Sequence, residues 1–184
     1  VSIPVQTICE IQQACYKIDD DRRWLIAIIS DTGMRLAEAA GLHINDLHLD
    51  DDVPYVDIKP HSWRSLKTKG SQRQVPLVGA SLWAAQRIKK TASSCFAFDR
   101  YTDNQQCRAN SASNALNKWM QTHFRDDIVI HGFRHALRDR LRAIQCPSEM
   151  IDQIGGWASG KIGEGYGEGF KLDTMCSYLE VLNP

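Results

Sequence analysis

The 184-residue sequence predicts a mainly helical domain with one small antiparallel β-sheet. Apolar residues recur at helical spacing in most segments, beginning with Ile8, Ile11 and Cys15. Residues 53–59 alternate apolar and polar residues in the way that is typical of a strand, and residues 72–77 suggest a second strand. With 43% apolar residues, a chain of this length can bury a core without disulfide bonds.

The N-terminal third predicts three helices. The first is expected over residues 7–18, and it ends at the acidic run 19–21, whose charges suit the start of the next helix. Residues 24–30 are apolar on nearly all sides, so the second helix should lie at the centre of the core. Gly33 ends this helix, and a short third helix is expected over 35–40, with a glycine behind it.

The middle of the chain holds the predicted sheet. The strand at 53–59 and the strand at 72–77 are separated by the basic segment HSWRSLKTKGS. This segment is expected to be either a hairpin connection or a third strand with its turn.

The rest of the chain is expected to be helical. Helices are predicted over 81–90, 112–123 and 131–144. Pro147 suits the first turn of another helix, which should run to about Ile154. The glycine-rich residues 158–170 are expected to be mobile, and a last short amphipathic helix is expected over 172–182.

Composition indicates an intracellular globular protein. No apolar run approaches the roughly 20 residues that span a membrane, and no secretory signal opens the sequence. The six cysteines are scattered without a CxxC pair, so we expect reduced thiols and a cytoplasmic location.

Charge is unevenly distributed along the chain, although the formal net charge is zero. Residues 1–58 carry 4 Lys/Arg and 11 Asp/Glu, whereas residues 59–90 carry 8 Lys/Arg and no acid. The basic stretch is a candidate for a phosphate-facing surface. Alternatively, it is a solvated face whose charges pair with the acidic first third.

Three segments contain residues that suit chemistry on a phosphodiester. They are TGMRLAEAAGL with Arg35, HGFRHALRDRL with His131 and Arg134, and GGWASGKIGEGYGEGF with Tyr166. Arginine matches phosphate oxygens with a rigid fork, and histidine moves protons at neutral pH. A free tyrosine has a pKa of about 10, so forming its phenoxide costs about 4 kcal/mol, which nearby cations or a base must offset.

These segments, in this order, resemble the catalytic domain of the tyrosine recombinases, also called the phage integrase family. The resemblance implies a single catalytic domain over residues 1–184 that cleaves and rejoins DNA through a covalent 3′-phosphotyrosine at Tyr166. It implies that Arg35 and Arg134 hold the phosphate, that Glu38 orients Arg35, and that His131 is a general acid or base. An upstream DNA-gripping domain is expected to be absent from this chain, which begins in mid-pattern.

Two further site residues follow from the resemblance. The family places a lysine ahead of a strand reading roughly R-x-V-P-L, and in KTKGSQRQVPL both Lys67 and Lys69 qualify. We prefer Lys67, which precedes the threonine and would protonate the departing 5′ oxygen. Trp157 stands where many members have histidine, nine residues before Tyr166; it would donate its indole N–H to a phosphate oxygen, or else be a core tryptophan.

The resemblance also implies partners and cofactors. We expect double-stranded DNA attachment sites, a homotetramer on DNA, accessory directionality or bending proteins, a phage or prophage origin, and no membrane association. Neither a metal nor ATP should be required, because arginines supply positive charge and the phosphotyrosine keeps the bond energy. His131 and His135 have a spacing that can bind metal, but no third ligand is evident.

Two other functions are compatible with the same residues. One is a type IB topoisomerase-like enzyme, which shares the chemistry but relaxes supercoils as a monomer. The other is a degenerate recombinase domain that only binds DNA or a partner. The short chain and the integrase-like HGFRH segment argue against the topoisomerase. The intact Arg35, His131, Arg134 and Tyr166 argue against the degenerate domain.

The C-terminal segment, residues 171–184, has two possible roles. Its apolar stripe consists of Leu172, Met175, Leu179 and Leu182. This stripe either docks on a neighbouring protomer, as family members often exchange such a segment, or folds back on its own core.

Overall fold

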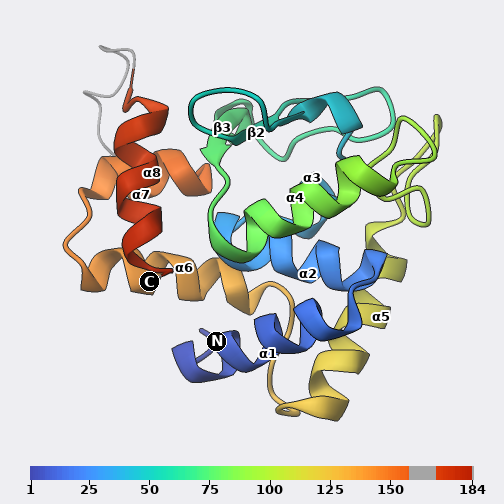
Figure 1. Ribbon diagram of the computed structural model, residues 1–184, viewed down its shortest axis with the longest axis horizontal. Coiled ribbons are helices and arrows are strands. Elements are labelled where there is room, and N and C mark those ends of the chain that lie inside the picture. The colour runs from blue at the N-terminus through green and yellow to red at the C-terminus, as the bar shows by residue number, and fades with distance from the viewer. Residues whose placement is uncertain (158–168, 184) are drawn as a thin grey trace.

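The computed structural model describes residues 1–157 and 169–183, which form a group of helices with one small sheet at its edge (Figure 1). The helices in this part of the chain are α1 (Val5–Ile18), α2 (Asp21–Thr32), α3 (Leu36–Ala40), α4 (Gly79–Thr91), α5 (Ala109–His123), α6 (Gly132–Ala143), α7 (Ser148–Gly155) and α8 (Leu172–Val181). The other described elements are the 3-10 helices η1 (Ile44–Asp46) and η2 (Lys69–Ser71) and the strands β1 (Leu47–His48), β2 (Tyr55–Ile58) and β3 (Arg73–Pro76).

The predicted helices are confirmed, with ends that differ by up to three residues. The start of α2 follows from local chemistry, because the Asp20 side chain accepts a hydrogen bond from the Arg23 main-chain N–H at 2.9 Å. Its end follows from Gly33, which adopts the left-handed conformation with φ of 63°. Of the glycine-rich residues 158–170, which were expected to be mobile, residues 158–168 lie outside the described part of the chain.

The sheet is antiparallel in the order β1-β2-β3, with Val56 of β2 opposite Leu47 on one side and Val75 on the other. Both predicted strands are confirmed as β2 and β3. The alternative of a strand within HSWRSLKTKGS is wrong, because that segment folds as turns and η2. The third strand is β1, whose two residues are too few to show an alternating pattern.

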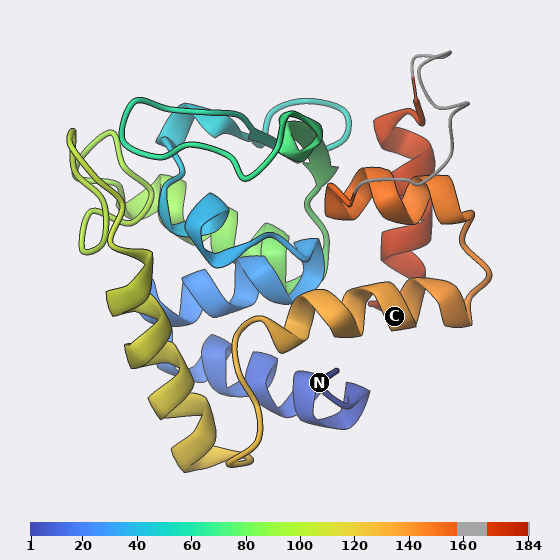
Figure 2. The ribbon, with the colours of Figure 1, turned by 180° about the vertical axis from the view of Figure 1, so that it is seen from behind.

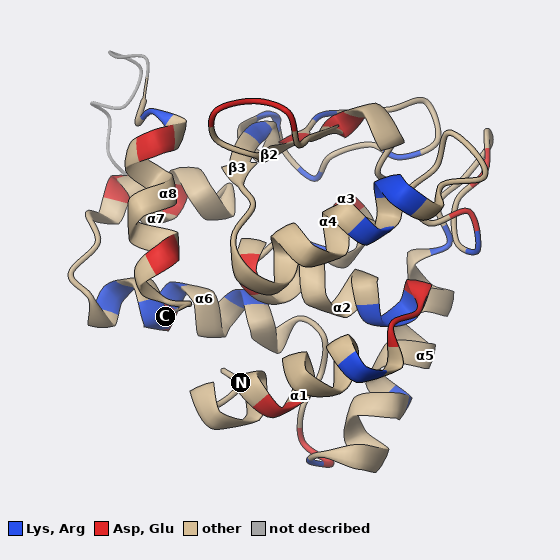
Figure 3. Cartoon of the chain, viewed as in Figure 1, with Lys and Arg blue, Asp and Glu red and all other residues tan. Residues whose placement is uncertain are grey.

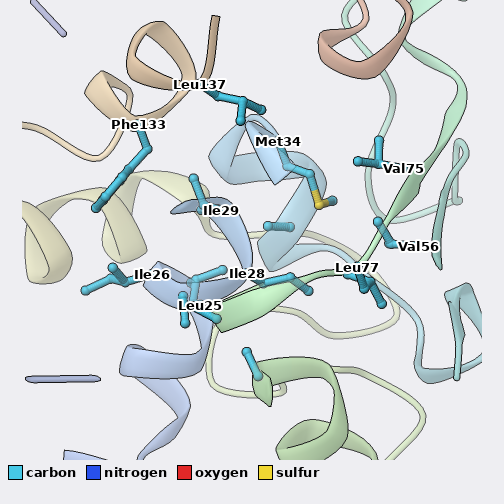
Figure 4. Packing of buried hydrophobic residues seen from close by; sticks show 14 of the residues in the cluster. Leu25, Ile26, Ile28, Ile29, Met34, Val56, Val75, Leu77, Phe133 and Leu137 are labelled. Carbon is cyan, nitrogen blue, oxygen red and sulfur yellow. The ribbon is translucent and has the colours of Figure 1, made fainter. Parts of the chain in front are cut away.

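Helix α2 lies at the centre of the core, as predicted. Residues 25–29 of this helix are each at most 1% exposed, and α2 packs against α1, α4 and α6. Figure 4 shows its leucine and isoleucine side chains between Phe133 and Leu137 of α6 and Leu77, which follows β3. The centre of the molecule is therefore the segment that immediately precedes Gly33 and Arg35.

The last three helices gather at one side of the molecule, beside β3 (Figures 1 and 2). Helix α8 packs on β3 of its own chain and buries Met175 and Leu179. Arg140 of α6 also donates a hydrogen bond to the Leu182 carbonyl at 3.1 Å. None of the described helices is long and apolar enough to cross a membrane.

The basic stretch 59–90 does not form a single surface. Figure 3 shows Lys and Arg spread over several elements. Lys59, Arg73 and Arg87 pair with carboxylates from the first third, as one of the two interpretations expected. Arg64 is buried against main-chain carbonyl groups. Four of the eight cationic side chains in this stretch therefore bind other groups of the protein.

Candidate active site

Arg35 lies where α2 ends and α3 begins. Its main-chain N–H donates to Glu38 Oε2 at 2.9 Å, and its Nη1 donates to Glu38 Oε1 at 2.8 Å. Nη1 also donates to Ser71 Oγ at 3.2 Å, and Nη2 to the Gly156 carbonyl at 3.4 Å. The Arg35 side chain remains 23% exposed, so it is held on several sides but still open to a ligand.

Arg73 is a site residue that sequence reasoning missed. It lies on β3, is 8% exposed, and donates from Nη2 to Glu38 Oε2 at 3.0 Å. Its Nε donates to the Ile154 carbonyl at 2.7 Å, which ties β3 to α7. Burial alone would raise the pKa of Glu38, but Arg73 and then Arg35 outweigh it and hold that pKa below its usual value. Glu38 therefore stays ionised between two arginines.

Arg134 approaches the same place from α6. It is 3% exposed, and its Nη1 donates to the carbonyl of Gly33 at 2.8 Å, two residues before Arg35. Burial, followed by the positive charges of Arg35 and Arg73, lowers the pKa of Arg134 to about 10. Such a guanidinium is still charged at neutral pH. Its buried Nη2 has no hydrogen-bond partner among the described residues.

Trp157 covers the guanidinium of Arg134. The Arg134 Cζ lies 4.2 Å from the centre of the indole ring, a cation–π contact, and Arg138 approaches the same ring at 5.0 Å. A Cβ at Gly155 would lie 1.8 Å from this indole, so only glycine leaves room for it. The structure thus places Trp157 where it restrains Arg134, in addition to any contact that its N–H makes with phosphate.

His131 directly precedes α6, one turn before Arg134. The residue is exposed, and its ring lies 5.0 Å from that of His135 in an edge-to-face arrangement. Partial desolvation, and then the charges of His135, Arg134 and Arg35, lower the pKa of His131. The imidazole is therefore neutral at pH 7 and able to accept a proton or a hydrogen bond.

Lys67 and Lys69 are both exposed on the connection between β2 and β3. Thr68, between them, shares a hydrogen bond of 3.0 Å with Ser71, and Ser71 in turn accepts from Arg35. On the C-terminal side of the lysines, the connection is therefore bound to Arg35 through Ser71. Both lysines remain candidates for the proton donor.

Tyr166 lies outside the described residues, but the chain on both sides of it is fixed to α7. Trp157 packs on Gly155, and Phe170 exchanges two hydrogen bonds with the side chain of Gln153, at 2.8 and 2.9 Å. The C-terminal end of α7 is also the point that Arg73 and Arg35 contact through main-chain carbonyls.

The arrangement brings together Arg35, His131, Arg134 and Trp157, with the lysine connection alongside. No group of three potential metal ligands gathers within the part of the chain that the structure describes. Ser71 contacts Arg35 and Arg73 contacts Glu38 in the same cluster. A signal for Arg73 was present in the sequence, since it is the arginine of the R-x-V-P-L pattern that located the lysine.

A model of the phage integrase family matches residues 4–169 of the chain. The chain belongs to the phage integrase family. No curated protein matches it in sequence.

Solved structures share the fold of this phage integrase family member. The Tn1549 transposon integrase bound to circular intermediate DNA superposes with a TM-score of 0.65 at 18% identity, over 99% of this chain and 67% of that one. The same integrase with transposon right end DNA gives 0.64 at 17% identity, over 100% and 66%. The XerH site-specific recombinase bound to a palindromic difH substrate gives 0.60 at 19% identity, over 100% and 50%.

These similarities confirm the predicted family and the tyrosine recombinase catalytic-domain fold. The chain spans about two thirds of the Tn1549 integrase structures and half of the XerH structure.

Proposed function

We propose that this protein is a site-specific DNA recombinase that cleaves and rejoins strands through a covalent 3′-phosphotyrosine at Tyr166. One observation carries the proposal: the guanidinium groups of Arg35 and Arg134, from distant segments, are held together, and one Arg134 donor has no partner among the described residues. Keeping like charges close is unfavourable: burial is the largest cause of the lowered pKa of Arg134, and the positive charges of Arg35 and Arg73 lower it further. A phosphodiester would relieve the repulsion and accept from Nη2 of Arg134, which has no partner within residues 1–157 and 169–183.

In the proposed reaction, the Tyr166 oxygen attacks phosphorus, and its proton passes to the neutral His131. A P–O bond to tyrosine forms as the P–O5′ bond breaks, and Lys67 or Lys69 protonates the departing 5′ oxygen. Arg35 and Arg134 neutralise charge that grows on the non-bridging oxygens. A 5′ hydroxyl from a second strand reverses the steps, so neither ATP nor a metal is needed.

Chain connectivity supports the role of Tyr166. This residue is three positions before Gly169, a span of at most about 11 Å for an extended chain. Gly169 lies against Gln153 of α7, the helix whose last carbonyl groups bind Arg73 and Arg35. The described residues next to this segment in the chain therefore lie beside the helix whose carbonyl groups bind the two arginines.

DNA is the proposed partner. The similar structures are described as complexes with transposon or difH DNA. For this chain we propose attachment sites of a phage or prophage, a tetramer on DNA with accessory directionality or bending proteins, and action in the cytoplasm of a bacterial host.

We further propose that α8 moves to a neighbouring protomer in that tetramer. In the single chain it packs on its own β3. Deletion of residues 171–184 should then impair assembly on DNA, measured by light scattering, more than it lowers the melting temperature of the free monomer. A large loss of monomer stability with normal assembly would show that α8 serves its own core alone.

Covalent trapping tests the proposed activity. The protein first selects its preferred duplex from a random pool, and a suicide substrate with a nick beside the cleavage position is built on that sequence. We expect a protein–DNA adduct whose linkage maps to Tyr166, and no adduct with Tyr166→Phe. An adduct that persists in this variant would exclude the assignment, and DNA binding without any adduct would favour a degenerate, DNA-binding domain.

A further inference from the structure

Arg64 is a buried arginine that the proposed reaction does not use. It lies in the connection between β2 and β3 and is 5% exposed. Burial lowers its pKa, although the negative charges of Asp46 and Glu38 oppose this effect. A buried arginine is costly unless its donors are satisfied, and the partners of this one show what it holds in place.

Two donor nitrogens of Arg64, Nη1 and Nη2, have partners, and Nη2 joins the connection to α3; Nε has no partner among the described residues. Nη1 donates to the Lys59 carbonyl at 2.7 Å, within the connection itself. Nη2 donates to the carbonyls of Glu38 at 3.3 Å and Gly41 at 3.4 Å, at the C-terminal end of α3. The neighbouring Trp63 adds a hydrogen bond from its indole N–H to the same Gly41 carbonyl at 2.9 Å.

Gly41 is shaped to receive this arginine. A Cβ at Gly41 would lie 2.8 Å from Arg64 Nε, closer than real contacts allow. The absent side chain therefore lets the guanidinium lie directly on the end of α3. Because the opposite end of this five-residue helix begins beside Arg35, Arg64 and Arg35 are fixed to the same short, rigid element.

The lysine segment, residues 65–70, is attached to the rest of the fold at both of its ends. Arg64 fixes its beginning to the end of α3, and Ser71 fixes its end to Arg35. The residues between them, 65–70, include both Lys67 and Lys69, which are exposed. A segment of six residues held at both ends has a restricted range of positions for its side chains.

We propose that Arg64 is a positioning residue for the leaving-group proton donor. It sets the position of the lysine segment relative to Arg35, and hence relative to the phosphate. The proposal rests on the proposed recombinase function, in which Lys67 or Lys69 protonates the 5′ oxygen.

The test replaces the leaving oxygen with sulfur. A 5′-bridging phosphorothiolate releases a thiolate, whose pKa near 8.5 means that it leaves without a proton, whereas an alkoxide needs one. A variant that has lost only proton donation should therefore form the adduct slowly on the oxygen substrate and at nearly the wild-type rate on the sulfur substrate. Adduct formation is measured on both forms of the suicide substrate under single-turnover conditions.

Arg64→Met should slow adduct formation on the oxygen substrate by about 10²-fold. On the sulfur substrate, the rate of the variant should lie within about fivefold of the wild-type rate. Lys67→Ala and Lys69→Ala are measured in parallel, and the one that shows the same pattern is the proton donor. The matched control is Arg73→Met, the same substitution at another buried arginine. It disturbs Glu38 and Arg35 and should be slow on both substrates.

Three results would overturn the proposal: a wild-type rate for Arg64→Met on oxygen, equal slowing on both substrates, or a rescue by sulfur in Arg73→Met as well. If Arg64→Met does not fold, as judged by circular dichroism, Arg64→Lys provides the same comparison, since lysine cannot bind all three carbonyls. Failure of the wild type to form any adduct would instead reject the proposed function, and the inference with it.

Discussion

Main-chain carbonyl groups hold the three arginines of the site. Arg134 donates to Gly33, Arg35 to Gly156, and Arg73 to Ile154. Glu38 is the carboxylate that Arg35 and Arg73 share. One negative charge among three positive ones leaves the site with excess positive charge, which is what binding a phosphodiester requires.

Glu38→Gln should cost about 3–5 kcal/mol of unfolding free energy, because it leaves the buried Arg73 without its counter-charge. The pKa of Glu38 is lowered in the folded protein, so its contribution is present above the ordinary carboxylate pKa and is lost as pH falls through the folded value. Denaturant unfolding measured between pH 7 and pH 3 checks both points. The difference in unfolding free energy between wild type and variant should become smaller as the pH falls. A difference that does not change with pH would contradict the ion-pair explanation.

The pKa of His131 should lie below 6.5, the ordinary value for histidine. His135→Gln should raise it, because a neighbouring positive charge is removed, while partial desolvation remains. Histidine NMR titrations of the two proteins measure the shift directly. An unchanged pKa in His135→Gln would mean that this neighbour does not tune the site.

At the scale of elements, the ends of two helices build the site. Gly33 and Gly156 both adopt left-handed conformations, with φ of 63° and 62°, and both present their carbonyl groups to arginines. The same residue thus stops a helix and orients a guanidinium. A Cβ at Gly156 would also lie 2.7 Å from Arg73 Nη1.

Gly156→Ala should therefore destabilise the fold by about 1–3 kcal/mol and reduce adduct formation. Gly70→Ala is the matched control, since a Cβ there meets nothing within 4 Å. Thermal unfolding and suicide-substrate assays of the two variants give the comparison. Equal behaviour of the two variants would show that the turn at Gly156 does not position the arginines.

The sequence predicted the elements well because each had a local cause. Asp20 and Gly33 delimit α2, and its apolar surface on all sides predicts its central place. Strand β1 was missed because its pairing with β2 is a contact between segments, and two residues carry no period. Of the site, Arg35, His131 and Arg134 were predictable from motifs. Arg73 was not assigned a role, because its contact with Glu38 joins residues 35 positions apart.

At the scale of the whole molecule, Asp31 connects distant elements. It is 1% exposed, and its carboxylate accepts from Gln12 of α1 at 3.1 Å and from the Ala80 N–H of α4 at 2.9 Å. Arg140 of α6 lies 3.7 Å from it and also donates to the carbonyl of Leu182, at the end of α8. The C-terminal helix is thereby coupled to the centre of the fold.

Arg140→Met should loosen α8 selectively. Burial raises the pKa of Asp31, and Arg140 opposes that rise. Without Arg140 the pKa should rise further, so the variant should lose more stability than wild type as pH increases from about 4 through that value. Hydrogen exchange at pH 7 should accelerate in α8 and not in α2. Unchanged exchange in α8 would show that Arg140 does not hold it.

In the proposed reaction, Arg35 and Arg134 act by neutralising charge at one phosphorus atom. The most direct measurement uses a suicide substrate whose scissile phosphate is replaced by a neutral methylphosphonate. Arg134→Ala should reduce the cleavage rate of the ordinary phosphodiester by about 10²–10³-fold. Its cleavage rate on the methylphosphonate should lie within about tenfold of the wild-type rate on that substrate. A variant that is equally impaired on both substrates would contradict the account, because its defect would not depend on the charge of the phosphate.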